Sequence, residues 1–278
     1  MPYSAEISRA NPSCFIFLID QSGSMADPIS GSEGKRKCDS VADAINRLLH
    51  NLIIKCARGE GVRNFYEVCV IGYGSTVAPA FSGLLAGRDL VPLSEVANAP
   101  ARVEERIKKI SDGAGGVIDQ KVKFPVWFEP VAKGITPMGT AIAMAANLLE
   151  TWVPKHRASY PPIVINITDG EATDSGPVPQ ASALTSLATD DGNTLLFNCH
   201  ISSQAVAPIV FPESDASLPD EFSRTLYSVS SPLPASLREL ARGENFALGP
   251  QARGFAFNAD LVELIRFLDI GTRAGNLR

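Results

Sequence analysis

Several kinds of sequence feature are scarce or missing in this chain, and each absence excludes a class of protein. No apolar run reaches the roughly 20 residues that a membrane-spanning helix needs, so we expect no membrane partner. The first six residues lack the basic-then-apolar order of a signal peptide. The five cysteines are odd in number and far apart, and without a C-x-x-C pair they offer no zinc knuckle. Together these features predict a cytoplasmic protein.

Neither positive nor negative charge dominates the sequence. The net charge is only −5, and no basic stripe is interleaved with aromatic residues, so we expect no binding to nucleic acid. The nearest basic run, residues 34–37, is interpreted as a solvated loop. The alternative is that Lys35, Arg36 and Lys37 steer an acidic partner toward the protein.

Apolar residues, by contrast, make up 45% of the 278 positions, enough to fill the core of one large domain. Continuous apolar runs, typical of strands buried on both faces, lie at residues 14–19, 66–73, 163–167, 194–199 and 254–257. Between these runs apolar positions recur three or four apart, which indicates amphipathic helices. The alternation predicts a doubly wound α/β fold with a mostly parallel central sheet and helices on both faces.

We expect a single domain over 1–278, with its core at about 13–269 and insertions at about 75–135 and 203–233. The first insertion is predicted to hold an edge hairpin, a charged helix around Val103, Ile107 and Ile110, and a glycine-rich turn at 113–116. Its aromatic end, residues 124–129, is interpreted either as part of a binding face or as a strand packed under the insertion.

Oxygen-bearing side chains gather in three loops of the predicted fold. Asp20, Ser22 and Ser24 follow the first strand, Asp169 follows the run at 163–167, and Thr136 precedes a predicted helix. Ligands of doubly wound sheets bind at the carboxyl ends of the strands, where these loops are expected to converge. Hard oxygen ligands without histidine or cysteine favour Mg²⁺. Thr140 is a rival to Thr136 as a ligand.

These residues carry a resemblance to a known family. The pattern Asp20-x-Ser22-x-Ser24 resembles the metal-ion-dependent adhesion site (MIDAS) of von Willebrand factor A (vWA) domains. In that family a Gly-x-Thr-Pro loop, here ending at Thr136 and Pro137, and an aspartate after the fourth strand, here Asp169, complete the site. The resemblance implies that Ser22 and Ser24 bind Mg²⁺ or Mn²⁺ directly. It implies that Thr136, Asp20 and Asp169 act directly or through water.

The short stretches at 18–25 and 135–139 resemble bacterial stand-alone vWA domains. Such relatives occur with MoxR-type AAA+ ATPases or with protein kinases and phosphatases. The resemblance therefore implies a metal-dependent adaptor in a bacterial stress, signalling or defence system, with the metal coordinating a Glu or Asp of a protein partner. The alternative is a metal-dependent phosphatase or nuclease. We expect no enzyme, because no histidine or lysine is placed to activate Ser22, and residues 134–140 lack a P-loop lysine.

Overall fold

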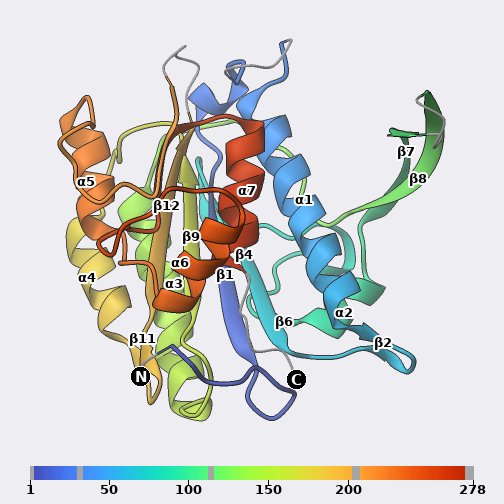
Figure 1. Cartoon of the computed structure of the whole chain (residues 1–278), viewed down its shortest axis with the longest axis horizontal. Helices are drawn as coiled ribbons and strands as arrows, with labels where there is room; N and C mark the ends of the chain where they lie inside the picture. Colours follow the sequence, from blue (N-terminus) through green and yellow to red (C-terminus); the bar gives the residue numbers. More distant parts are fainter. Residues whose placement is uncertain (1–2, 30–33, 112–115, 202–206, 273–278) are drawn as a thin grey trace.

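A central eight-stranded sheet organises the molecule (Figure 1). The computed structural model describes residues 3–29, 34–111, 116–201 and 207–272. The strands follow the order β13 (Ile209–Val210), β14 (Phe255–Ala259), β12 (Leu195–Ile201), β9 (Ile163–Thr168), β1 (Ser13–Asp20), β4 (Tyr66–Tyr73) and β5 (Val77–Pro79), and β6 (Val91–Pro92) also pairs with β4. The five long strands are mutually parallel, whereas the short β5, β6 and β13 pair antiparallel. The predicted mostly parallel α/β sheet is confirmed.

Helices cover both faces of the sheet. One layer contains α1 (Lys37–Cys56), α2 (Leu93–Asn98), α6 (Ala235–Gly243) and α7 (Leu261–Gly271). The other contains α3 (Met138–Trp152), α4 (Val178–Ser186) and α5 (Glu221–Val229). Short 3₁₀ helices are η1 (Gly23–Ala26), η2 (Gly83–Leu85) and η3 (Val153–Lys155), and small strand pairs are β2 (Ala57–Arg58) with β3 (Gly61–Val62) and β10 (Ala188–Thr189) with β11 (Gly192–Asn193). Within the described residues, no helix combines the length and apolarity needed to cross a membrane.

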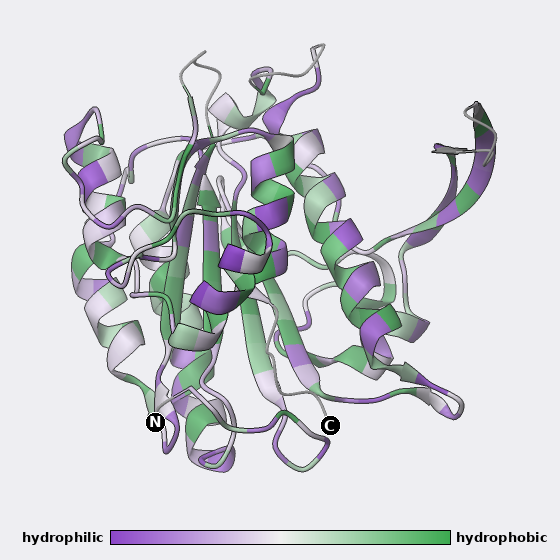
Figure 2. Cartoon of the chain, in the orientation of Figure 1, coloured by the Kyte–Doolittle hydropathy of each residue, from purple (hydrophilic) through white to green (hydrophobic). Residues whose placement is uncertain are grey.

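The apolar run of β1 is buried along its whole length because helices pack against both sides of it. Successive strand side chains point to opposite faces, so Phe15 and Phe17 enter the core layer of α1, and Ile16 and Leu18 enter the layer of α3. Figure 2 shows green, hydrophobic stretches along the central strands, and both green and purple, hydrophilic residues along α1.

The chain reverses its direction of winding at β1. It leaves β1 through α1 to reach β4 on one side, and later returns through α3 to β9 on the other side. Both neighbours are parallel to β1. The carboxyl ends of β1 and β9 therefore border a topological switch point, the usual place for a ligand in this fold class.

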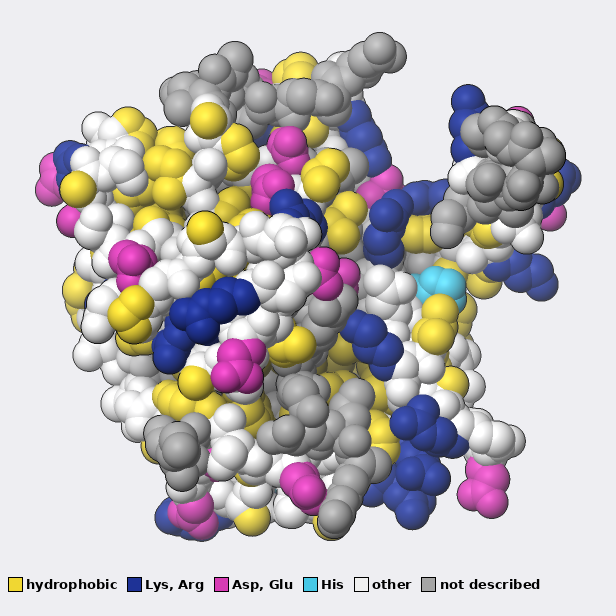
Figure 3. All heavy atoms as spheres, in the orientation of Figure 1, with side chains coloured by type: hydrophobic (Ala, Val, Ile, Leu, Met, Phe, Trp, Pro, Cys, Tyr) yellow, Lys and Arg dark blue, Asp and Glu magenta, His cyan; other side chains and the backbone are white. Residues whose placement is uncertain are grey.

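A two-stranded ribbon of β7 (Arg102–Ser111) and β8 (Val117–Val126), here called the arm, stands out from the body in Figure 1. The charged helix predicted around Val103 and Ile107 is therefore wrong. Ten-residue antiparallel pairing with β8 overrides the helical spacing, and an ion pair joins Lys121 to Glu105 across the strands. The predicted glycine-rich turn at 113–116 falls mostly outside the described residues. Val103, Ile107 and Ile118 are each more than half exposed, and Figure 3 shows Lys and Arg side chains along the arm.

Beyond Glu104 and Phe124 the arm contacts the body through the partly exposed ion pair of Arg106 with Asp43, and pairs of this kind add little stability, so we expect this part of the arm to be dispensable. Joining Glu104 to Phe124 through an Asn-Gly turn should change the free energy of unfolding by less than about 1 kcal/mol. Denaturant unfolding followed by circular dichroism measures this change. Trp127→Ala at the base of the arm is the contrasting variant, with an expected loss of about 3–5 kcal/mol. A loss of that size on shortening the arm would show that it belongs to the core.

Of the two interpretations of residues 124–129, the structure favours the packed strand, because β8 ends at Val126 and the next two residues are buried beside α1. Trp127 and Phe128 are each at most 2% exposed. The side-chain oxygen of Asn46 on α1 accepts hydrogen bonds from the amides of both residues, at 2.8 and 3.0 Å. The indole of Trp127 donates to the carbonyl of Val96 on α2. These bonds satisfy the backbone where β8 enters the body.

Candidate metal centre

Three loops that are far apart in the sequence are tied together at the switch point by backbone hydrogen bonds. The amide of Gly23 donates to the carbonyl of Gly134 at 3.1 Å, and the amide of Lys133 donates to the carbonyl of Gln21 at 2.6 Å. The amide of Thr173, in the loop after β9, donates to the carbonyl of Thr136 at 2.9 Å. The loops that follow β1 and β9 and the loop that precedes α3 thus form one framework.

The framework brings three side-chain oxygens into a row. The hydroxyl oxygens of Ser22 and Ser24 are 3.1 Å apart, and the Ser24 hydroxyl donates to Oδ1 of Asp169 at 2.8 Å. Neighbouring ligands of an octahedral Mg²⁺, each at roughly 2.0–2.1 Å from the ion, are separated by about 2.9 Å. Ser22 is buried, Ser24 is exposed, and the Asp169 side chain is buried, so the solvent reaches this row at Ser24. The spacing of these oxygens fits one edge of such a coordination sphere.

Asp20 is the last residue of β1 and lies two residues before Ser22. Its Oδ1 accepts a hydrogen bond from the amide of Ser22 at 2.8 Å, and its Oδ2 accepts one from the hydroxyl of Thr168 at 2.7 Å. The residue is 1% exposed, and burial raises its pKa to about 6 although the bonds from Ser22 and Thr168 lower it. In this geometry Asp20 holds the Ser22 backbone in place and contributes negative charge to the cluster of candidate ligands.

Lys37, the first residue of α1, also contacts this cluster. Its ammonium lies 2.8 Å from Oδ2 of Asp169 and 3.9 Å from a carboxylate oxygen of Asp27. The Lys37 side chain is 5% exposed and that of Asp169 is fully buried. The interpretation of residues 34–37 as a solvated loop is therefore wrong for Lys37. Local sequence does not reveal this contact, because the partner lies 132 residues further along the chain.

The two threonine candidates have different surroundings. Thr140 is in the first turn of α3, where its amide and hydroxyl both donate to Oδ2 of Asp174, at 2.8 and 2.9 Å. Burial alone would raise the pKa of Asp174, but hydrogen bonds from Thr140 and Gly139 lower it. Thr136 is buried, and its amide donates to the hydroxyl of Thr173 at 3.0 Å. Since Thr140 is engaged by Asp174, Thr136 is the better candidate ligand.

One glycine is required for this framework. Gly134 has a φ of +102°, a conformation that other residues rarely adopt. A Cβ atom there would lie 2.3 Å from the amide nitrogen of Ser75. Any larger residue would strain this backbone and push the loop that carries Thr136 away from Ser75, which follows β4.

The donor set is compatible with one hard divalent cation. Asp20 and Asp169 are carboxylates, and Ser22, Ser24 and Thr136 are hydroxyls, a set that suits Mg²⁺ or Mn²⁺. No cluster of three or more His, Cys, Asp and Glu suited to a metal is present in the part of the chain that the structure describes. The role of all five residues as metal ligands stays a prediction. Sequence reasoning did not predict the contacts of Lys37 with Asp169, of Thr168 with Asp20 or of Asp174 with Thr140.

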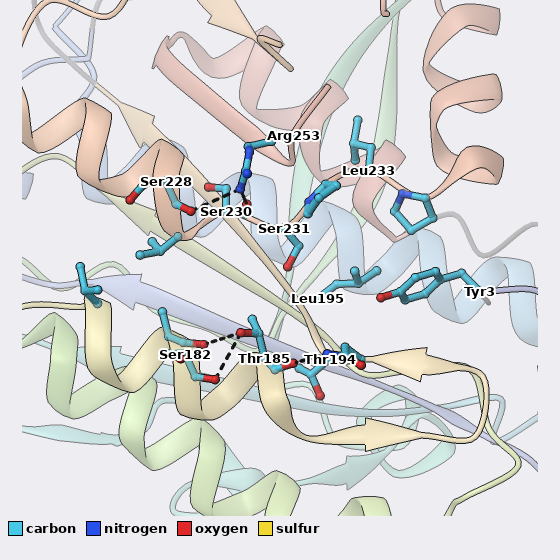
Figure 4. A pocket seen from close by; sticks show the side chains of 16 residues that line it. Tyr3, Ser182, Thr185, Thr194, Leu195, Ser228, Ser230, Ser231, Leu233 and Arg253 are labelled. Carbon is cyan, nitrogen blue, oxygen red and sulfur yellow. Dashed lines mark hydrogen bonds between the residues drawn. The ribbon is translucent and has the colours of Figure 1, made fainter. Parts of the chain in front are cut away.

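A hollow of about 540 Å³ lies at the other edge of the sheet, where β12 begins (Figure 4). Arg253 lies in its wall, but its guanidinium donates to the carbonyls of Ser228 and Ser230 at 3.3 and 2.6 Å. The Thr185 hydroxyl donates in the same way to the carbonyl of Ala181. With these polar groups engaged by backbone, the switch point is the stronger candidate for function.

Comparisons with known proteins reach only distant similarities. No family model matches the sequence, and no curated protein matches it. The chain is similar to proximal thread matrix protein 1 from the mussel byssus, with a TM-score of 0.49 and 14% identity over 98% of this chain and 49% of that one. It is also similar to the vWF domain of the type V pili tip protein Mfa5 from Porphyromonas gingivalis (TM-score 0.33, 16% identity, 59% of this chain and 39% of that one). A third is the ArnB paralog VWA2 from Sulfolobus acidocaldarius (TM-score 0.34, 13% identity, 71% of this chain and 36% of that one).

The chain thus spans about half the length of the first of these proteins, and less of the others. The similarities concern the fold alone. The fold class rests on the strand order itself, and the function rests on the site.

Proposed function

We propose that the chain is a vWA-type domain that binds one Mg²⁺ or Mn²⁺ through Asp20, Ser22, Ser24, Thr136 and Asp169, and uses the ion to hold a Glu or Asp of a protein partner. The observation that carries this proposal is the row of oxygens from Ser22 to Asp169, with its octahedral spacing, at the switch point of the sheet. The bound ion would supply an electrophilic position to which a carboxylate binds.

The roles of the protein's own residues follow from their contacts. Asp20 fixes the Ser22 backbone, Asp169 fixes the Ser24 hydroxyl, and the bonds of Thr136 to Thr173 fix the third loop. Hydroxyl ligands neutralise less of the ion's charge than carboxylates would, so an incoming carboxylate gains more from it. Ser24 is exposed, which leaves the site open to a partner.

Binding is favoured over hydrolysis by the surroundings of the cluster. A metal hydrolase needs a group that activates water, and the nearby Asp174 accepts hydrogen bonds from α3 through both oxygens. His200 is on β12 opposite Thr168, but its ring is stacked on Phe257 with centroids 4.9 Å apart. Burial lowers the pKa of His200 to about 4. We therefore propose an adaptor, in a bacterial stress, signalling or defence system, rather than an enzyme. A MoxR-type ATPase or a kinase or phosphatase system is the class of partner to test first.

The two threonines allow a matched test of the metal site. Thr136→Ala should weaken Mn²⁺ binding by about tenfold or more, because it removes one ligand position. Thr140→Ala should leave Mn²⁺ affinity within about twofold and lower the free energy of unfolding by about 1 kcal/mol, because it removes one hydrogen bond at the start of α3. Isothermal titration calorimetry measures the affinity. Equal Mn²⁺ affinity in the wild type and both variants would place the ligand elsewhere.

The partner is tested by capture from bacterial lysate with immobilised protein, in Mg²⁺ and in chelator. A partner bound through the ion should be retained only in Mg²⁺, and should be lost with Ser24→Ala while the circular dichroism spectrum stays unchanged. Equal recovery in all conditions would contradict the proposed mechanism.

A further inference from the structure

Lys37 is the one lysine or arginine that is buried among the residues the structure describes. Burying an ammonium costs free energy unless a partner compensates it. The position is also unfavourable for a cation, because Lys37 begins α1 and the amino end of a helix carries partial positive charge. A lysine in such a place therefore calls for a specific partner.

That partner is the carboxylate of Asp169. Its two oxygens face two different groups: Oδ1 accepts from Ser24, and Oδ2 accepts from the Lys37 ammonium, both at 2.8 Å. The backbone holds the lysine there, since the amide of Lys37 donates to the carbonyl of Asp27 at 2.9 Å. Asp27 in turn bonds through its amide to the carbonyl of Ser24. The ammonium is thus built into the same loop as the serine row.

We propose that Lys37 is the resident cation of the metal-free site and that it competes with the divalent ion for Asp169. This inference rests on the proposed function, because it concerns the same cluster. Lys37 neutralises one of the two buried carboxylates before any metal arrives. A divalent ion at Ser22 and Ser24 then shares Asp169 with a second positive charge, which lowers its affinity.

The same charges link metal binding to partner binding. Two carboxylates, one ammonium and one divalent ion leave the cluster with a net charge of +1, whereas without the ammonium it would be neutral. An anionic group from a partner removes this excess, so the ion and a carboxylate should each increase the affinity for the other. In this way Lys37 would lower the affinity of the free protein for the metal, and the affinity would rise when a partner carboxylate is bound.

The test is a calorimetric titration of Mg²⁺ and of Mn²⁺ into the full chain, comparing the wild type with Lys37→Met. We expect Lys37→Met to bind each ion about tenfold more tightly or better. Lys35→Met is the matched control: it removes the same charge two residues away, where the side chain pairs with Asp43, and it should stay within about twofold of the wild type. Lys37→Gln, which keeps a hydrogen-bond donor near Asp169, gives the same comparison if the methionine variant folds poorly.

A second reading uses thermal unfolding. In chelator, Lys37→Met should melt at a lower temperature than the wild type, because Asp169 has lost its partner, and Mg²⁺ should raise its melting temperature more than that of the wild type. Tighter binding by the variant supports the inference. If only the variant binds, the inference stands and the metal part of the proposed function falls. Equal affinities overturn the inference alone, and no binding by either protein overturns both.

Discussion

Asp169→Ala is expected to lower the free energy of unfolding by about 3–5 kcal/mol, even in chelator. The reason is that removal of one partner of a buried ion pair leaves the other charge buried and uncompensated. The Lys37 ammonium would keep only Asp27 at 3.9 Å, and the side chain of Asp27 is 62% exposed. Denaturant unfolding of the wild type and the variant measures the loss directly.

Two further variants show whether the loss comes from this pair. Asp27→Ala should cost less than about 1 kcal/mol, since its contact with Lys37 is long and largely solvated. Adding Lys37→Met to Asp169→Ala should restore part of the stability, and the double-mutant cycle gives the coupling between the two residues. A loss below about 1 kcal/mol for Asp169→Ala itself would mean that water replaces the missing carboxylate.

Asp20→Asn is expected to stabilise the metal-free protein at pH 8 while weakening metal binding by at least about tenfold. Asparagine keeps an oxygen for the amide of Ser22 but removes a buried charge. Burial raises the pKa of Asp20 from 3.8 to about 6, so the folded protein holds this proton more tightly than the unfolded chain. The resulting cost of the ionised carboxylate is about 3 kcal/mol above pH 6 and fades as the pH falls toward 4.

The stability advantage of Asp20→Asn over the wild type should therefore be largest at pH 8 and small at pH 4, with chelator present throughout. Asp174→Asn is a matched control, for which the expected change in stability has the opposite sign. Its pKa is lowered by hydrogen bonds from Thr140 and Gly139, so its carboxylate stabilises the fold above its ordinary pKa, and its removal should destabilise the protein at pH 8. An Asp20→Asn variant less stable than the wild type at pH 8 would show that its two hydrogen bonds outweigh the buried charge.

Much of the fold could be predicted because its signals are local. The run at 66–73 is a strand at those same residues, and the alternation of buried strands with amphipathic helices was enough to predict the sheet. The loops bearing Asp20, Ser22 and Ser24 were expected to meet the loop of Asp169, because parallel strands end at one edge. The structure places Ser24 in hydrogen-bond contact with Asp169.

The features that were missed depend on contacts distant in the sequence. Val103 and Ile107 have helical spacing, and only pairing with β8 makes their segment a strand. Lys37 lies in a basic run that is typical of a surface loop, and only its ion pair with Asp169 shows that it is buried. For Trp127 a binding face and a packed strand stayed open as alternatives, because the sequence gives no sign that Asn46 bonds to its backbone. In each case a partner elsewhere in the chain decides the environment.

The bonds between Gln21 and Lys133, Gly23 and Gly134, and Thr136 and Thr173 have a consequence for motion. They join the three loops to one another, and two of these loops directly follow β1 and β9, which lie at the centre of the sheet and have neighbours on both sides. Central strands open last in most folds, whereas surface loops open locally and often. Held together and tied to these strands, the cluster should thus open less often than an unsupported surface loop. An arriving ion would find its ligands already in place. The rate of its binding would then be limited by the loss of its own hydration water rather than by ordering of the protein.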